Sequence, residues 1–164
     1  MRIVLACLLL VLTVSGVYAE TPQIQRIDVL EYGIYTADEK GCHRDAQGIN
    51  RCERSNVRHA ATTLSVPAQL RVQFGMRFKA VGVPSGATVP VKRVWILPAA
   101  GLNSPMVKEP IHRLERSDSV KINVTEFISY TFDDPWELVP GTWTLEYWDG
   151  NRKLLSKSFM VAKP

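Results

Sequence analysis

The 164-residue sequence lacks the motifs by which most enzymes are identified. It contains no Gly-x-Ser-x-Gly nucleophile motif, no His-Glu-x-x-His zinc motif and no phosphate-binding glycine loop. Its three histidines, His43, His59 and His112, lie in separate segments without metal-ligand spacing. We therefore predict no catalytic residue, no cofactor and no metal ligand. An enzyme stays open as an alternative, because a Ser/His/Asp triad occurs in several chain orders.

Concentrated charge is also missing. The chain has 20 lysines and arginines against 16 aspartates and glutamates, a net charge of +4, without a block of basic residues. Acidic residues are densest at Asp133, Asp134 and Glu137, beside Pro135. Such residues are typical of a turn, and the Asp-x-Asp-x-Asp-Gly pattern of a calcium loop is absent. The sequence therefore argues against nucleic-acid binding and against a calcium site.

The chain has only one long apolar run, at its amino end. Arg2 precedes ten apolar residues, 3–12, and the pattern Val17-Tyr18-Ala19 follows, which is the layout of a secretory signal peptide cleaved after Ala19. The alternative is a retained membrane anchor, but the 17 residues from Ile3 to Ala19 fall short of the roughly 20 that a span needs. We predict a signal peptide over residues 1–19, a single domain over 20–164 and no membrane span after cleavage. The protein is expected to be exported, periplasmic or secreted.

Cysteine is scarce. Once Cys7 is removed with the signal peptide, Cys42 and Cys52 remain, and such a pair in an exported protein predicts a disulfide. A zinc site that adds His43 and His59 is less favourable. Nine residues separate the two cysteines, whereas zinc-binding pairs are usually separated by about two to four.

Amphipathic helices are missing as well, and the pattern of alternation predicts strands instead. Over 70–80 the apolar residues Leu70, Val72, Phe74, Met76, Phe78 and Ala80 share one parity, as in an antiparallel strand with one buried face. Two alternating runs, 27–29 and 30–34, are out of phase by one residue, which predicts a β-bulge. Further strands are expected over 58–66, with Leu64 and Val66 inward, and over 89–97, 111–114 and 120–132. The proline-rich segment 98–110 predicts a long loop.

The carboxyl-terminal segment predicts a β-hairpin with an aromatic core face. Trp143, Leu145 and Tyr147 share one side of its first strand, and the turn Asp149-Gly150-Asn151 follows. The turn length leaves the register open, with Leu145 opposite either Leu155 or Leu154. Trp148 has the solvent-facing parity, where it either packs across the strands on Lys153 or stacks on a ligand.

About seven short strands without helices predict an all-β, immunoglobulin-like antiparallel β-sandwich. The segments "RIDVLEYGIYTAD", "VPAQLRVQFGMRFKAVGVPSGATVPV" and "YTFDDPWELVPGTWTLEYWDGNRKLLSKSFMV" resemble the bacterial family called domain of unknown function 3859. The resemblance extends from about Ile27 to Val161, and the run from Trp136 to Trp143 is its most specific part. It implies a small exported or envelope-associated domain and supplies no catalytic residues. The Cys42/Cys52 pair departs from the family pattern.

We interpret the chain as a non-catalytic binding or accessory domain of the cell envelope, monomeric, whose partner is a protein or glycan of the envelope. Binding residues concentrate on loops held by a rigid scaffold, so we expect the cysteine loop 41–54 and the loop 98–110 to bind. The candidate binding surface comprises Trp148, Arg44, Arg51, Arg54 and Arg58. Two interpretations of the arginines stay open. They attract anionic envelope material, or they lie on a solvent-exposed face of a sheet and bind nothing.

Three alternatives belong to other classes of protein. A small exported inhibitor of a hydrolase would present the disulfide-closed loop as a stiff segment. An envelope hydrolase would need His59 or His112 beside an acidic residue. A purely structural module would co-purify with an envelope assembly at fixed stoichiometry.

Overall fold

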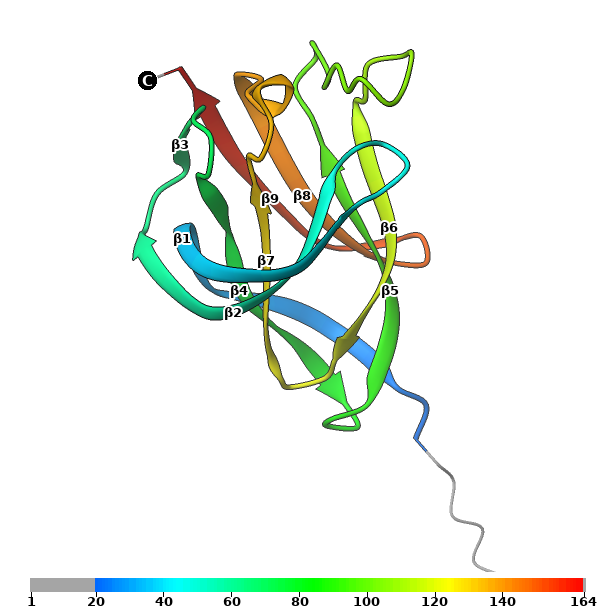
Figure 1. The fold of residues 1–164 in the computed structure, drawn as a ribbon. Coiled ribbons are helices and arrows are strands. Elements are labelled where there is room, and N and C mark those ends of the chain that lie inside the picture. Colours follow the sequence, from blue (N-terminus) through cyan, green and yellow to red (C-terminus); the bar gives the residue numbers. More distant parts are fainter. Residues whose placement is uncertain (1–19, 164) are drawn as a thin grey trace, which may run out of the picture.

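The computed structural model describes residues 20–163, which form two β-sheets packed face to face (Figure 1). In chain order the elements are β1 (Gln23–Arg44), β2 (Asn50–Ala61), β3 (Ser65–Pro67), β4 (Gln73–Val83), β5 (Thr88–Ile96), β6 (Arg113–Lys121), β7 (Thr125–Thr131), the 3-10 turn η1 (Pro135–Glu137), β8 (Gly141–Asp149) and β9 (Arg152–Ala162). The predicted signal peptide, residues 1–19, lies outside the described residues. Across residues 20–163 no helix has the length and apolar character that a membrane crossing requires.

The strand order is β2-β1-β4-β7 in the first sheet and β3-β9-β8-β5-β6 in the second. Neighbouring strands run antiparallel, except that β3 pairs with β9 in parallel. The predicted immunoglobulin-like β-sandwich is thus confirmed. The described residues form nine strands, more than predicted. One reason is that the segment 58–66 contributes to two of them, the end of β2 and the short β3 in the other sheet.

Alternating residues of β4 and β8 build the interior between the sheets. Phe74 and Phe78 of β4 are buried, and so are Trp143, Leu145 and Tyr147 of β8. The rings of Phe74 and Trp143 meet edge to face with 5.9 Å between their centroids, an arrangement that aromatic quadrupoles favour. The predicted core faces of both strands are therefore confirmed.

Several strand ends differ from the prediction because the backbone turns where extension was expected. Leu64 and Leu70, expected on buried faces, are 43% and 41% exposed. Leu70 precedes Arg71, whose φ of 67° turns the chain before β4 begins, and Leu64 lies in a bend before β3. The strands expected over 111–114 and 120–132 are instead β6 and β7, separated by a turn in which Asn123 has a φ of 61°.

Two of the register shifts bear on the predictions from the sequence. The register of β1 against β4 shifts between Val29 and Glu31, which confirms the bulge predicted from the change of phase. The second bulge lies in the β8–β9 hairpin, where the register shifts after a two-residue loop, between Tyr147 and Trp148. Leu145 consequently lies opposite Lys157, so both registers considered from the sequence are wrong.

Candidate functional site

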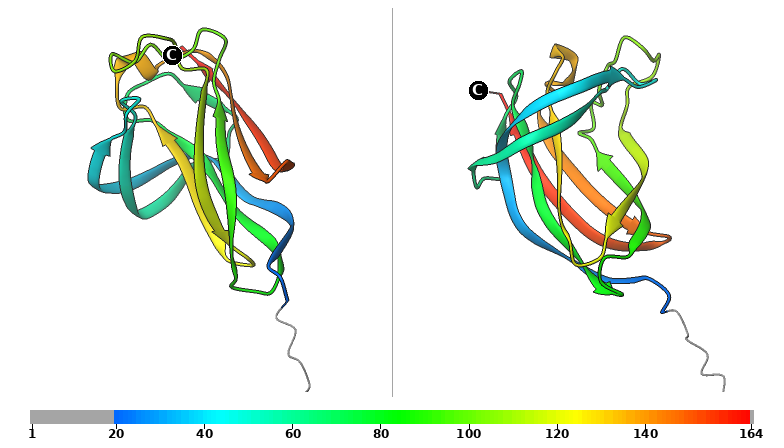
Figure 2. Two further views of the ribbon diagram at one scale, coloured as in Figure 1. Left: turned by 90° about the vertical axis from the view of Figure 1, so that its right-hand side faces the viewer. Right: turned by 60° about the horizontal axis from the view of Figure 1, so that its bottom comes forward.

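The long strand β1 pairs with two different neighbours in turn. Residues from Gln23 to Tyr35 pair with β4, and residues from Ile34 onward pair with β2. Residues 36–58 therefore extend beyond β4 as a two-stranded unit, which we call the arm. It crosses in front of β7 toward β6 (Figure 2). The segment 41–54, expected to be a loop, is the outer part of this arm and consists mostly of strand.

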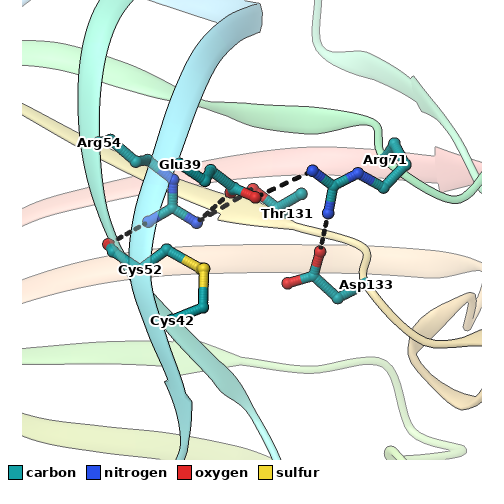
Figure 3. The surroundings of a disulfide bond; sticks show 7 residues. All are labelled: Glu39, Cys42, Cys52, Arg54, Arg71, Thr131 and Asp133. Carbon is teal, nitrogen blue, oxygen red and sulfur yellow. Dashed lines mark hydrogen bonds and ion pairs between the residues drawn. A yellow bond between two sulfur atoms is a disulfide. The ribbon is translucent and has the colours of Figure 1, made fainter.

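A disulfide joins the two strands of the arm. Cys42 and Cys52 are bonded through their Sγ atoms, and their Cα atoms lie 4.1 Å apart (Figure 3). The disulfide predicted from the sequence is thus confirmed. A carboxylate oxygen of Glu39 and the two sulfur atoms lie within 4.8 Å of one another. Because the sulfur atoms are bonded to each other, they do not supply the thiolates that a zinc ion would need.

Replacing both cysteines, as Cys42→Ser with Cys52→Ser, is expected to lower the free energy of unfolding by about 2–3 kcal/mol. The bridge joins two residues that are 10 positions apart in the chain, and the chain-entropy model gives about this magnitude for such a loop. Urea unfolding followed by tryptophan fluorescence measures the loss. The serine variant with added reductant is the control, since reductant should change only the native chain. An unchanged urea midpoint in the double variant would contradict a stabilising role.

The tip of the arm is organised around one carboxylate. Asp45 Oδ1 accepts hydrogen bonds from the backbone N–H groups of Gln47, at 2.8 Å, and Ile49, at 3.0 Å. Asp45 Oδ2 accepts from Arg51 at 2.8 Å and also from Arg116, which belongs to β6 of the second sheet. One acidic side chain thus closes the tip turn and binds it to the other sheet.

Two further contacts fasten the tip to the body of the domain. Arg44 donates two hydrogen bonds to the carboxylate of Asp134, at 2.6 and 3.1 Å. Ser104, in the loop 98–110, donates its hydroxyl to the carbonyl oxygen of Gln47 at 2.6 Å. The two segments expected to bind a partner therefore contact each other.

A second network anchors the middle of the arm. The carboxylate of Glu39 lies between two guanidinium groups, 3.3 Å from Arg54 and 3.0 Å from Arg71 (Figure 3). Arg54 also donates to the hydroxyl of Thr131 on β7 at 3.1 Å, and Arg71 pairs with Asp133 at 2.7 Å. Residues far apart in the sequence are thereby fixed beside the end of β7.

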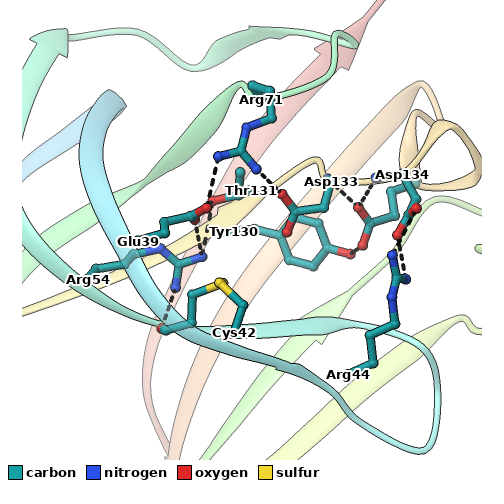
Figure 4. Close-up of polar contacts among 11 residues, drawn as sticks. Glu39, Cys42, Arg44, Arg54, Arg71, Tyr130, Thr131, Asp133 and Asp134 are labelled. Carbon is teal, nitrogen blue, oxygen red and sulfur yellow. Dashed lines mark hydrogen bonds and ion pairs between the residues drawn. A yellow bond between two sulfur atoms is a disulfide. The ribbon is translucent and has the colours of Figure 1, made fainter.

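The acidic cluster at 133–137 is a turn closed by a buried carboxylate, as the turn interpretation predicted. Glu137, only 1% exposed, accepts from the hydroxyl of Tyr130 at 2.8 Å and from the backbone N–H groups of Asp133, at 2.6 Å, and Asp134, at 2.9 Å. Burial raises the pKa of Glu137, although these hydrogen bonds act in the opposite direction. Figure 4 shows that this turn presents Asp134 to Arg44 of the arm.

A groove of about 400 Å³ lies between the arm and β7. It is lined by Ile49, Asn50, Arg51, Cys52, Arg54, Val57, Arg93, Phe127, Ile128, Ser129, Tyr130 and Thr131. Of the five candidate binding residues, Arg51 and Arg54 line this groove. Arg44 is instead paired with Asp134 at the arm tip, and Arg58 is exposed on β2. The groove thus gathers two of the four candidate arginines.

Trp148 lies in the second sheet and does not line the groove. It is opposite Lys153, whose ammonium nitrogen is 4.9 Å from the centroid of the indole ring. Its Nε1–H donates to Glu146 at 2.9 Å. The side chain therefore packs across the strands, as the first of the two alternatives for Trp148 predicted.

The three histidines remain separated in the fold. His59 lies on β2, with Nε2 3.1 Å from the carbonyl oxygen of Tyr32 and Nδ1 3.7 Å from a carboxylate oxygen of Glu31. His43 is exposed on β1, and His112 is exposed just before β6. The structure thus forms one histidine–acid pair, His59 with Glu31, but places it outside the groove.

Sequence reasoning missed one arginine of the groove and the acidic partners of all three groove arginines. Arg93 lies on β5 and pairs with Asp118 at 2.8 Å. One signal was available, because Arg93 shares the parity of Val89, Val91 and Trp95, all of which are buried. A charged residue on an apolar strand face has to find a polar environment. No comparable signal marks Asp45 or Glu39.

The two packed sheets and the arm define an immunoglobulin-like β-sandwich domain. The chain is similar to an immunoglobulin-like protein from Pseudomonas aeruginosa whose crystal structure is known. That comparison gives a TM-score of 0.60 and 28% sequence identity and covers 90% of this chain and 100% of the other. The chain belongs to the family described as Domain of unknown function (DUF3859), which residues 23–161 match. No curated protein matches the sequence.

Proposed function

We propose that this protein is an exported, monomeric, non-catalytic binding domain of the cell envelope, and that it recognises its partner through the groove between the arm and β7. The observation that carries the proposal is the presence of three arginines, Arg51, Arg54 and Arg93, in the lining of one groove. They come from two different sheets. Guanidinium groups are strong, directional donors to anionic groups.

The arm supports the proposal because it is fixed before any partner arrives. The disulfide and the ion pair Arg54–Glu39 join its two strands to each other. The ion pair Arg44–Asp134 and the hydrogen bond from Arg54 to Thr131 hold it beside β7. A surface that is already ordered loses less conformational entropy on binding. The same contacts argue against the inhibitor alternative, because an inhibitory loop has to project into an active site, whereas Asp45 and Gln47 at the arm tip are bonded to the domain itself.

Site-specific photo-crosslinking in envelope fractions tests the binding site. A photoreactive amino acid at Asn50, in the groove, is expected to capture a discrete partner, and the same amino acid at Thr142, exposed on the second sheet, is expected not to. Combining the Asn50 probe with Arg51→Gln and Arg54→Gln should abolish the product, while Arg58→Gln on the same strand should preserve it. The proposal fails if the Asn50 and Thr142 probes yield the same products.

Export is tested independently by cell fractionation and amino-terminal sequencing of the purified native protein. The expected result is a chain that begins at Glu20 in the envelope or secreted fraction, because the pattern Val17-Tyr18-Ala19 precedes it. A cytosolic chain that retains Met1 would overturn this part of the proposal.

A further inference from the structure

We propose that the groove binds an extended polypeptide segment with acidic side chains, which adds a strand to the edge of β7. This inference rests on the proposed binding function and specifies the class of partner. It follows from two features of the groove, the backbone of β7 and the side chains that face it.

The backbone of β7 offers hydrogen-bonding groups to the groove. Among the described residues β7 pairs with β4 alone, so it is an edge strand of the first sheet. Phe132, the residue after β7, donates its N–H to Val72 at 3.1 Å and accepts from the N–H of Arg71 at 2.8 Å. The backbone groups of Phe132 therefore point toward the β4 side.

The alternation along a strand then shows which residues of β7 direct their backbone N–H and C=O groups away from β4. Successive residues direct their N–H and C=O groups to opposite sides of a strand, so those of Phe127, Ser129 and Thr131 point away from β4. All three residues line the groove. The edge from residue 127 to residue 131 spans about 14 Å. This length offers three residues for pairing with an incoming strand.

The side chains of the groove favour carboxylates in the incoming strand. Three arginines line it, and its lining residues within the described chain include no aspartate or glutamate. The acidic partners of these arginines do not line the groove. Two of them are shared with other arginines, since Asp45 also binds Arg116 and Glu39 also binds Arg71. Arg54 Nε is buried without a hydrogen-bond partner among the described residues. A guanidinium carries five N–H donors, so donors remain for a carboxylate.

The combination of an edge strand with arginines favours a peptide over another polyanion. A polysaccharide or phosphate could bind the guanidinium groups, but it lacks the alternating donors and acceptors that pair with a strand edge. The apolar lining residues Ile49, Val57 and Ile128 suit the other side chains of an alternating acidic–apolar segment. The arm covers the edge, which protects it from indiscriminate pairing between sheets.

The test uses the mature chain and two synthetic peptides, acetyl-Val-Glu-Val-Glu-Val-amide and its Lys analogue, with polygalacturonate as a non-peptide anion. Isothermal titration calorimetry is expected to show that the Glu peptide binds about tenfold more tightly than the Lys peptide. Amide NMR shifts on binding should concentrate at Phe127, Ser129 and Thr131. Stronger binding of polygalacturonate than of the Glu peptide, or shifts confined to other strands, would overturn the inference.

Proline substitutions separate the edge from the rest of the fold. Ser129→Pro removes one N–H that points into the groove and the hydroxyl that accepts from Gln73, and it leaves the backbone ladder with β4 intact. It should therefore lower the affinity for the Glu peptide by about tenfold. Thr125→Pro is the matched control. Thr125 has the same parity on β7 but lies outside the groove lining, so peptide affinity should not change. Circular dichroism verifies that both variants are folded.

Four outcomes would refute the inference in different ways. If Ser129→Pro binds the Glu peptide as tightly as the native chain does, the edge of β7 is not the binding element. If the native chain forms a dimer that Ser129→Pro abolishes, a second copy occupies the edge instead of a partner peptide. If the peptides do not bind but the Asn50 crosslink stays specific, this inference fails and the proposed function survives. If both experiments fail, both proposals fall.

Discussion

Replacing Trp143 by alanine is expected to lower the free energy of unfolding by about 3–5 kcal/mol. The indole is fully buried, and its ring lies 4.9 Å from that of Tyr130 and 5.4 Å from that of Phe132, centroid to centroid. The substitution removes this packing, leaves a cavity between the sheets and deprives the carbonyl oxygen of Val139 of its Nε1–H donor. A domain of this size is stable by only about 5–15 kcal/mol, so the loss is a large fraction of the total.

Trp148→Ala is the matched control, because Trp148 lies on the same strand but faces outward. The substitution removes the contact with Lys153 and the hydrogen bond from Nε1–H to Glu146, together worth about 1–2 kcal/mol at such a site. The urea concentration at the midpoint of unfolding should therefore be much lower for Trp143→Ala than for Trp148→Ala. If Trp143→Ala does not fold, Trp143→Phe provides a smaller cavity for the same comparison. Equal midpoints for Trp143→Ala and Trp148→Ala would contradict the core position of Trp143.

Replacing Glu137 by alanine is expected to cost about 3 kcal/mol. The carboxylate satisfies three donors at once, the hydroxyl of Tyr130 and the backbone N–H groups of Asp133 and Asp134. Each buried donor that loses its partner costs about 1–3 kcal/mol, partly offset because a desolvated carboxyl group is removed. The turn that presents Asp134 to Arg44 should loosen as well. Chemical unfolding and hydrogen exchange of the arm measure these two effects.

The raised pKa of Glu137 makes its contribution depend on pH, and Glu137→Gln isolates that dependence. Burial raises the pKa of Glu137 in the folded state. The carboxyl group of Glu137 is therefore still protonated in the folded chain at a pH at which it is already ionised in the unfolded chain. Stability from this group is then fully present below the unfolded pKa of about 4.3 and is lost as pH rises through the folded value. The stability of the native chain relative to Glu137→Gln should therefore fall as pH rises from about 4. A difference that rises with pH would contradict the assigned direction.

The parts of the fold that the sequence predicted rest on the alternation of neighbouring residues. The parity of Phe74 and Trp143 identified the interior because successive side chains of a strand point to opposite faces. The change of phase near Leu30 predicted a bulge for the same reason, and the structure places a register shift there. The hairpin register could not be predicted in this way. It depends on a bulge between Tyr147 and Trp148 for which the sequence carries no distinct signal.

The candidate site could be predicted only in part, because it depends on residues that are distant in the sequence. Arg51 and Arg54 were singled out by their position around the cysteines, but Arg93 reaches the groove from the other sheet. Arg44 and Asp134, 90 positions apart, meet because the arm crosses β7. Nothing in either local segment indicates the other.

By itself the sequence determined a two-layer β-fold, the faces that form its interior and the pairing of Cys42 with Cys52. These features follow from the spacing of neighbouring side chains and from the scarcity of cysteine, which are local properties of the chain. Only the tertiary structure decided that β1 changes partners near Tyr35 and that a groove lined by three arginines lies between the arm and β7. The physical reason is that ion pairs and strand edges between remote segments form only where packing of the whole domain brings them together.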